Sequence, residues 1–358
     1  MRIRRRLPII LAVLVVVAAV AFAVVLRKHA PPEAARLLPG ADGFVYVNLG
    51  WMRRANLAGE LPPVPHDPDY EQFIQATGIQ FERDLDEAAL AIQYPAGSSD
   101  AKGGHSQTRF SEVLAGKFDG ERLRAYLRQI SSSVDNYQTR DIYNIPLEGR
   151  VLRACILGVD TVAASNLEDP LVIRGIIQRS RKLASPFGGP ALLRQYYKEV
   201  PLASLGWAIF KIQPSAGVSV SGSVTGWSFL FTKPATAVAS VRYLGAVHFK
   251  AQAVTGSDEE ANQVAARIET YLNLFRSAES TVPAAPGTDA DIKTFFDSLK
   301  IQTQKNRAVL TAAVPLALIR KVLEAPAAVT LQAQPPENNS SAESKSTAKK
   351  KKASNQNR

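Results

Sequence analysis

The chain has 358 residues, a formal net charge of +11 and a single cysteine. Residues 1–28 hold six Arg or Lys and no acid, and residues 337–358 hold six Lys or Arg against two Glu, so the two ends account for ten of the positive charges. The middle of the chain is nearly neutral, which argues against a nucleic-acid-binding surface there. A lone cysteine also excludes an internal disulfide.

An uncharged apolar run covers residues 7–26, between the basic residues of 1–6 and Arg27-Lys28. At about 1.5 Å per residue, a helix of this length reaches about 30 Å, which matches the bilayer core. More positive charge precedes the run than follows it, so we expect a single-pass anchor with residues 1–6 in the cytoplasm. The triplet at 21–23 would also suit a signal peptidase, but the run is longer than a cleaved signal core.

The absence of disulfides in a domain outside the cytoplasm favours a bacterial protein over a eukaryotic lumenal one. We therefore place the anchor in the bacterial inner membrane. The bulk of the chain, from residue 30 onward, then lies in the periplasm or outside the cell.

Residues 30–184 predict a first half of mixed strands and helices. Runs of β-branched and aromatic residues predict strands at 44–49, 88–94, 111–118, 140–145, 151–157 and 161–164. Helices are expected at 71–76, ending near Gly78, at 120–130 behind an Asp119 cap, and after Asp169-Pro170.

Residues 190–324 predict a second half of the same kind. The expected elements are a helix at 191–198, a strand at 205–212, a meander over 218–231 and 238–254, a helix from Ser257 and Glu260 to Phe275, a helix at 292–299, a strand at 309–314 and a final helix at 316–323. Residues 325–358 have too little apolar surface to fold and form a Lys-rich disordered tail. The fold class is α+β, with antiparallel or mixed sheets and amphipathic helices on one face.

A strand, a polar cap and an amphipathic helix containing Tyr-Leu occur twice. The first unit runs through Asp119 to Tyr126-Leu127, and the second through Ser257 to Tyr271-Leu272. This echo suggests that the two halves are a duplicated unit.

Potential metal ligands are densest at His66, Asp67 and Asp69. Imidazole and carboxylate groups this close can bind a divalent ion, but no second cluster completes the coordination and the surrounding prolines favour a surface turn. His105 lies in the polar loop 98–109, and His248 lies on a predicted strand, so neither is expected to be a catalytic base. We predict no metal and no cofactor.

The sequence also lacks the motifs of a catalytic nucleophile and of a phosphate-binding loop. The alternating Ser219, Ser221 and Ser223 lack the strand-to-helix elbow of a hydrolase, and no Gly-rich phosphate loop is present. Cys155 lies in a strand-like run and is expected to be a buried structural thiol. The acidic groups at 119–121, 258–260 and 289–291 lie at predicted helix N-termini, where they stabilise the helix.

The tail carries a block of four lysines, Lys349, Lys350, Lys351 and Lys352. Such a block can contact anionic lipid or an acidic polymer weakly and in a salt-sensitive way. We favour the simpler explanation, a solvated tail that keeps the chain soluble. We expect no contact with nucleic acid.

Three segments carry a resemblance: LLPGADGFVYVNLGWMRR at 37–54, VLAGKFDGERLRAYL at 113–127 and DTVAASNLEDP at 160–170. With the basic N-terminus and the anchor, this order resembles a family of uncharacterised, singly anchored bacterial envelope proteins known as domains of unknown function. The resemblance covers the first half of the chain and implies an envelope location and an α+β fold. It supplies no catalytic residue.

The sequence therefore predicts a membrane-anchored envelope protein that acts as an interaction or scaffold module and is not an enzyme. The alternative is a domain that binds a lipid or another small ligand; an enzyme with a scattered site ranks third. A large apolar cavity would favour the ligand-binding alternative, and a packed core with an exposed apolar patch would favour a protein partner.

Overall fold

The computed structural model describes residues 30–54, 66–94, 109–147, 149–181, 188–213, 230–281 and 290–316. Four predicted segments lie wholly or almost wholly outside these residues: the anchor at 7–26, the first run of the meander at 218–231, the helix at 316–323 and the tail at 325–358. Within the described segments, no helix has the length and apolar character needed to cross a membrane.

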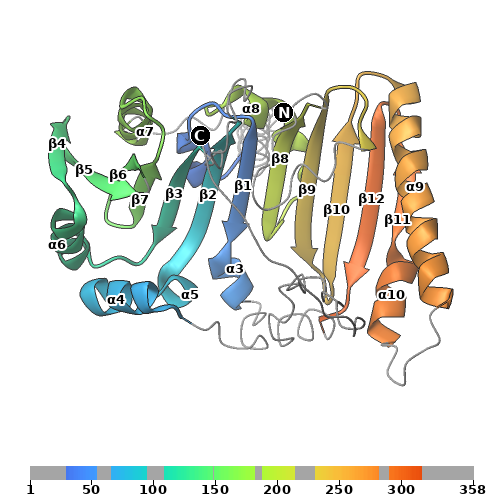
Figure 1. The fold of residues 1–358 in the computed structure, drawn as a ribbon, viewed down its shortest axis with the longest axis horizontal. Helices are drawn as coiled ribbons and strands as arrows, with labels where there is room; N and C mark the ends of the chain where they lie inside the picture. The colour runs from blue at the N-terminus through green and yellow to red at the C-terminus, as the bar shows by residue number, and fades with distance from the viewer. Residues whose placement is uncertain are drawn as a thin grey trace, which may run out of the picture.

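The described strands form one antiparallel sheet in the order β11-β12-β10-β9-β8-β1-β2-β3-β7-β6-β5-β4 (Figure 1). The strands are β1 (Gly43–Asn48), β2 (Leu85–Gln93), β3 (Arg109–Gly116), β4 (Ser133–Tyr137), β5 (Arg140–Leu147), β6 (Arg150–Ile156), β7 (Thr161–Ser165), β8 (Gly206–Ile212), β9 (Ala235–Tyr243), β10 (Val247–Val254), β11 (Lys300–Thr303) and β12 (Arg307–Val314). The two predicted halves meet where β1 pairs with β8.

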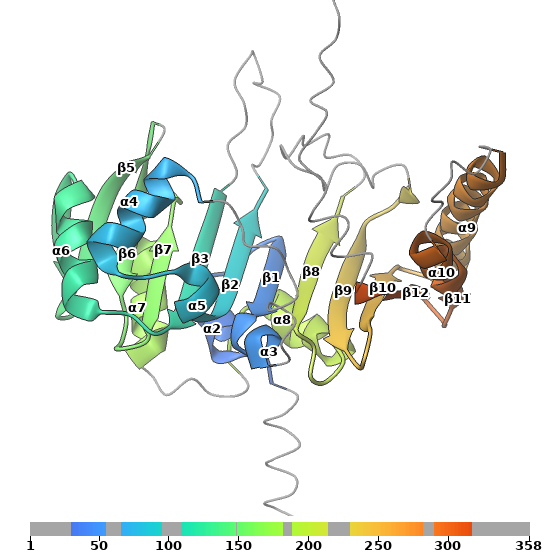
Figure 2. The same ribbon diagram turned by 90° about the horizontal axis from the view of Figure 1, so that it is seen from below.

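Helices lie on both faces of this sheet, so the expectation of helices on one face is wrong. We call the face covered by α2 (Glu33–Leu37), α7 (Leu171–Arg181) and α8 (Ala191–Tyr196) the first face. The opposite, second face is covered at one end by α4 (Pro68–Thr77) and α6 (Gly120–Ile130) and at the other by α9 (Asp258–Thr281). Figure 2 shows α2, α7 and α8 on one side of the strands and α4 and α9 on the other.

The reason for two covered faces is that the central strands are apolar on both sides. In β1, Phe44 and Tyr46 point to the first face and are buried, whereas Val45 and Val47 point to the second. The first-face side chains join Ile173, Ile176 and Ile177 of α7 and residues of α2 and α8 in the largest buried cluster. That cluster spans the boundary between the two predicted halves.

Local signals set the N-termini of α6 and α9 where the sequence placed them, whereas α4 begins at Pro68 and not at 71, and α9 ends at Thr281 and not at Phe275. Asp119 caps α6, and its Oδ1 accepts from the backbone N–H of Glu121 and Arg122, each at 3.1 Å. Ser257 caps α9 by accepting from the N–H of Glu260 at 3.2 Å. The sequence missed five short elements, which are α2, α3 (Leu49–Arg54), α5 (Phe81–Asp84), β4 and β11.

The two predicted units occupy matching places in the sheet. Strands β1, β2 and β3 lie side by side, α6 follows β3, and β7 returns beside β3. Strands β8, β9 and β10 repeat this order, α9 follows β10, and β12 returns beside β10. Because β1 and β8 are antiparallel, this topology is consistent with two units related by a two-fold axis through the sheet, and it supports the duplication hypothesis.

Replacing Asp119 tests whether its side chain stabilises the N-terminus of α6. We expect Asp119→Ala to lower the free energy of unfolding by about 0.5–2 kcal/mol, because two backbone N–H groups lose their acceptor. Chemical denaturation of the full chain in detergent, followed by circular dichroism, measures this change. Asp119→Asn keeps an acceptor oxygen and serves as the control. Equal losses in both variants would contradict a capping role.

Candidate functional site

The second face of the five central strands carries apolar side chains that the buried clusters leave incompletely covered. Its side chains are partly exposed, whereas their first-face neighbours are buried. We call it the open face, and it consists of Val45, Val47, Ala88, Leu90, Ile92, Phe110, Glu112, Leu114, Ala208, Phe210, Ala237, Ala239 and Val241. On β1 and β2, the three buried clusters of the described chain draw only on first-face side chains.

Glu112 is the one charged member of the open face. It lies on β3 opposite Leu90 of β2 and Ala164 of β7. Burial raises the pKa of its carboxyl above the ordinary value, because the charged form loses water there. A basic group that covered this surface would replace the lost water and stabilise the carboxylate. Glu112 is therefore a candidate acceptor for such a group.

A small aromatic pocket lies on the first face, where β1 and β8 pair. It has a volume of about 200 Å³ and is lined by Tyr46, Trp207 and Tyr197, among others. The rings of Tyr46 and Trp207 stack with centroids 5.5 Å apart, and Tyr197 meets Trp207 edge-on at 5.4 Å. Burial raises the pKa of Tyr197 to about 12, and it raises the pKa of Tyr46 as well.

The rim of this pocket is apolar and exposed. Trp51 of α3 and Leu202 of the loop after α8 line it and are 48% and 50% exposed, respectively. The next residue, Ala203, has a φ of 58°, a conformation that an alanine adopts only when its surroundings hold it there. Pro32, at the start of the described chain, also lines the pocket.

A wider cleft of about 560 Å³ lies beside α8. Its lining mixes polar and apolar groups, including Lys198, Lys211 and Thr236. An ion pair between Arg307 and Glu199 lies at its edge, and Asp42 pairs with Lys211 at 3.4 Å. Two of its cations, Arg307 and Lys211, therefore already have acidic partners, which weakens the case for an anion site.

The predicted His66 cluster is structural in the described chain. Asp67 caps α4 by accepting from the Tyr70 N–H at 2.7 Å, and His66 Nδ1 lies 2.7 Å from a carboxylate oxygen of Glu71. Asp69 lies in the first turn of α4. Among the described residues, no group of three acidic, His or Cys side chains has the geometry to hold a metal ion.

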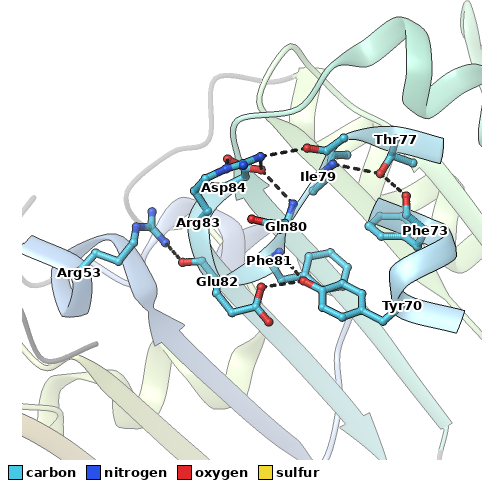
Figure 3. A network of polar contacts seen from close by, with 11 residues as sticks. Arg53, Tyr70, Phe73, Thr77, Ile79, Gln80, Phe81, Glu82, Arg83 and Asp84 are labelled. Carbon is cyan, nitrogen blue, oxygen red and sulfur yellow. Dashed lines mark hydrogen bonds and ion pairs between the residues drawn. The ribbon is translucent and has the colours of Figure 1, made fainter. Parts of the chain in front are cut away.

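The same region is tied together by the polar network in Figure 3. The Tyr70 hydroxyl donates to Glu82 at 2.8 Å and accepts from the Phe81 N–H at 2.7 Å, which fixes α5 against α4. Arg53 donates to the Glu82 carbonyl oxygen at 3.2 Å. These contacts account for the polar side chains without a catalytic role.

The other residues that the sequence analysis weighed as catalytic or binding residues are either structural or lie outside the described residues. His248 lies on β10, and Cys155 is fully buried in the first-face cluster, as predicted for a structural thiol. His105, the serines at 219, 221 and 223, and Lys349 to Lys352 lie outside the described residues.

Sequence patterns did not single out the open face, Glu112 or the aromatic pocket. Apolar residues at successive positions of β1 and β2 are the signal that both faces of the sheet need cover. The pocket had no such signal, because Tyr46 and Trp207 are brought together only by the pairing of β1 with β8.

Comparisons with known proteins give little further information. No family model and no curated protein matches the chain. Solved structures of TP0453 are similar: crystal form III has a TM-score of 0.45 at 8% identity and covers 82% of this chain and 98% of that one. Crystal form IV has a TM-score of 0.40 at 10% identity, covering 81% and 96%, and form I has 0.40 at 9%, covering 82% and 97%. At these values the likeness carries no functional argument.

Replacing Glu112 with a neutral side chain tests whether its poorly hydrated charge destabilises the fold. A carboxyl whose folded pKa is raised destabilises the fold at neutral pH, and this penalty fades as the pH falls to the ordinary carboxyl pKa. We therefore expect Glu112→Gln to raise the Tm at neutral pH, with a gain that shrinks in acid. Thermal melts across this pH range measure it. The exposed Glu121→Gln is the control, and an equal gain there would contradict the argument.

The thiol of Cys155 gives a second test of burial. Burial raises its pKa to about 12, so almost no thiolate is present at neutral pH. We expect a thiol reagent to modify the folded chain very slowly and the denatured chain completely, as followed by absorbance. Rapid modification of the folded chain would contradict the buried position.

Proposed function

We propose that the chain is a single-pass, membrane-anchored envelope protein that acts as an interaction module without a catalytic site. The observation that carries this proposal is the open face, a partly exposed apolar surface across five strands of an otherwise packed sheet. A contiguous apolar surface that remains partly exposed is typical of contacts between proteins. The anchor rests on the apolar run at 7–26 and on the charges beside it.

The shape of the open face favours a helical partner. Five strands spaced about 4.8 Å apart span about 19 Å between the outer strand axes, which leaves room for one or two helices of about 10 Å diameter. The small side chains of Ala208, Ala237 and Ala239 lie over β8 and β9 and let a helix approach closely. Glu112 favours a partner helix that carries a basic residue.

The alternative, a lipid- or small-ligand-binding domain, has weaker support. The two cavities of about 560 and 200 Å³ lie on the first face or beside α8, and the larger has a mixed polar lining. Neither of these two cavities is an enclosed apolar site of the kind that holds a lipid. Lipid remains an outcome that the experiment below distinguishes.

Photo-crosslinking from the open face tests the proposal. A benzophenone amino acid replaces Phe210 of β8 in the full chain in its native membrane, because this change keeps an aromatic side chain on the open face. We expect one protein adduct, whose mapped site is an apolar helical segment with a basic residue. The same amino acid in place of Val159, which is 90% exposed in the turn between β6 and β7, is the control and should give no such adduct.

The outcome of the crosslinking experiment distinguishes the interaction module from the ligand-binding alternative. A mapped helical adduct that weakens with Glu112→Gln supports the proposal. An adduct to lipid favours the ligand-binding alternative, and an adduct confined to other residues of the same chain shows that the chain covers its own open face. Either of the last two results overturns the proposed partner site.

A further inference from the structure

The described chain begins close to the point where the predicted anchor ends. The predicted span ends at Leu26, and the backbone is fixed from Pro31, which is buried, into the core residues Ala34 and Ala35 of α2. The five residue steps from Leu26 to Pro31 cover at most about 18 Å even when fully extended. An anchor at 7–26 would therefore hold Pro32 close to the membrane surface.

The aromatic pocket lies at this point of attachment. Pro32 lines it, and its floor is formed by Tyr46 and Trp207, which are first-face side chains. An anchor that ends at Leu26 would bring the first face around the β1–β8 pair nearest to the bilayer. Figure 2 shows α2, α3 and α8 gathered on this side, away from α4 and α9.

Two large apolar side chains at the pocket rim face solvent in this position. Trp51 is 48% exposed and Leu202 is 50% exposed. Tryptophan is favoured in the headgroup layer, where its ring is partly in apolar surroundings and its N–H remains hydrated. This layer adds about 5–8 Å on each side of the hydrocarbon core, so side chains beside a short tether can reach it.

We propose that Trp51 and Leu202 form a membrane-contact patch that lies in the headgroup layer of the bilayer holding the anchor. The proposal rests on the anchor in the proposed function, because the tether brings the patch to the membrane. The loop that carries Leu202 is held by its own contacts, since the Ser204 hydroxyl donates to the Pro201 carbonyl oxygen at 2.7 Å. The patch is therefore presented in a fixed conformation.

Fluorophore quenching in proteoliposomes tests the patch. Leu202→Cys in the full chain is labelled with an environment-sensitive fluorophore; Cys155 is buried and should stay unlabelled. The vesicles contain phosphatidylethanolamine and phosphatidylglycerol, with or without nitroxide-bearing lipid. We expect nitroxide lipid to quench most of the emission at position 202. The loss should persist at high salt, because an apolar contact is not screened.

Leu274→Cys is the matched control, since Leu274 is 64% exposed on α9, which packs on the second face. Retention of the chain after an alkaline carbonate wash reports on the anchor separately. A retained chain with equal quenching at 202 and 274 overturns the patch and leaves the anchor standing. A chain that washes out of the vesicles removes the tether, and the patch proposal falls with it.

Discussion

The pairing of β1 with β8 is the contact on which the rest of the architecture depends. It joins the strands of residues 30–184 to those of residues 190–324 in one continuous sheet. It also places Phe44 opposite Ile209 and Tyr46 opposite Trp207, so the largest buried cluster draws on both halves. Separating these strands would break that cluster and the aromatic pocket together, because neither half carries all of the side chains that form them.

The two faces of the sheet differ in how completely they are covered. The first face is covered by α2, α7 and α8 around the aromatic pocket, and Pro32 lines that pocket. The second face is covered near α6 and near α9, and the open face lies between them. If the first face lies toward the bilayer, the open face points away from it. Membrane contact and partner binding would then use opposite sides of one sheet and would not compete.

Local chemistry explains which parts of this fold can be predicted from sequence. Asp119, Ser257 and Asp169-Pro170 act within one helical turn, so the helices they begin are found correctly. The short α2 and β4 carry too few residues for a periodic pattern. The number of covered faces depends on which strands lie in the centre, and that is a property of long-range pairing. Tyr46, Trp207 and Glu112 acquire their surroundings in the same way, so no spacing rule identifies them.

The repeated topology accounts for which helices share a face of the sheet. In the first unit, α2 precedes β1 and α6 follows β3; in the second, α8 precedes β8 and α9 follows β10. A two-fold axis through the β1–β8 pair carries each face of the sheet onto itself. It therefore relates α8 to α2 on the first face and α9 to α6 on the second. The open face lies over the strands nearest that axis, between the surfaces that α6 and α9 cover.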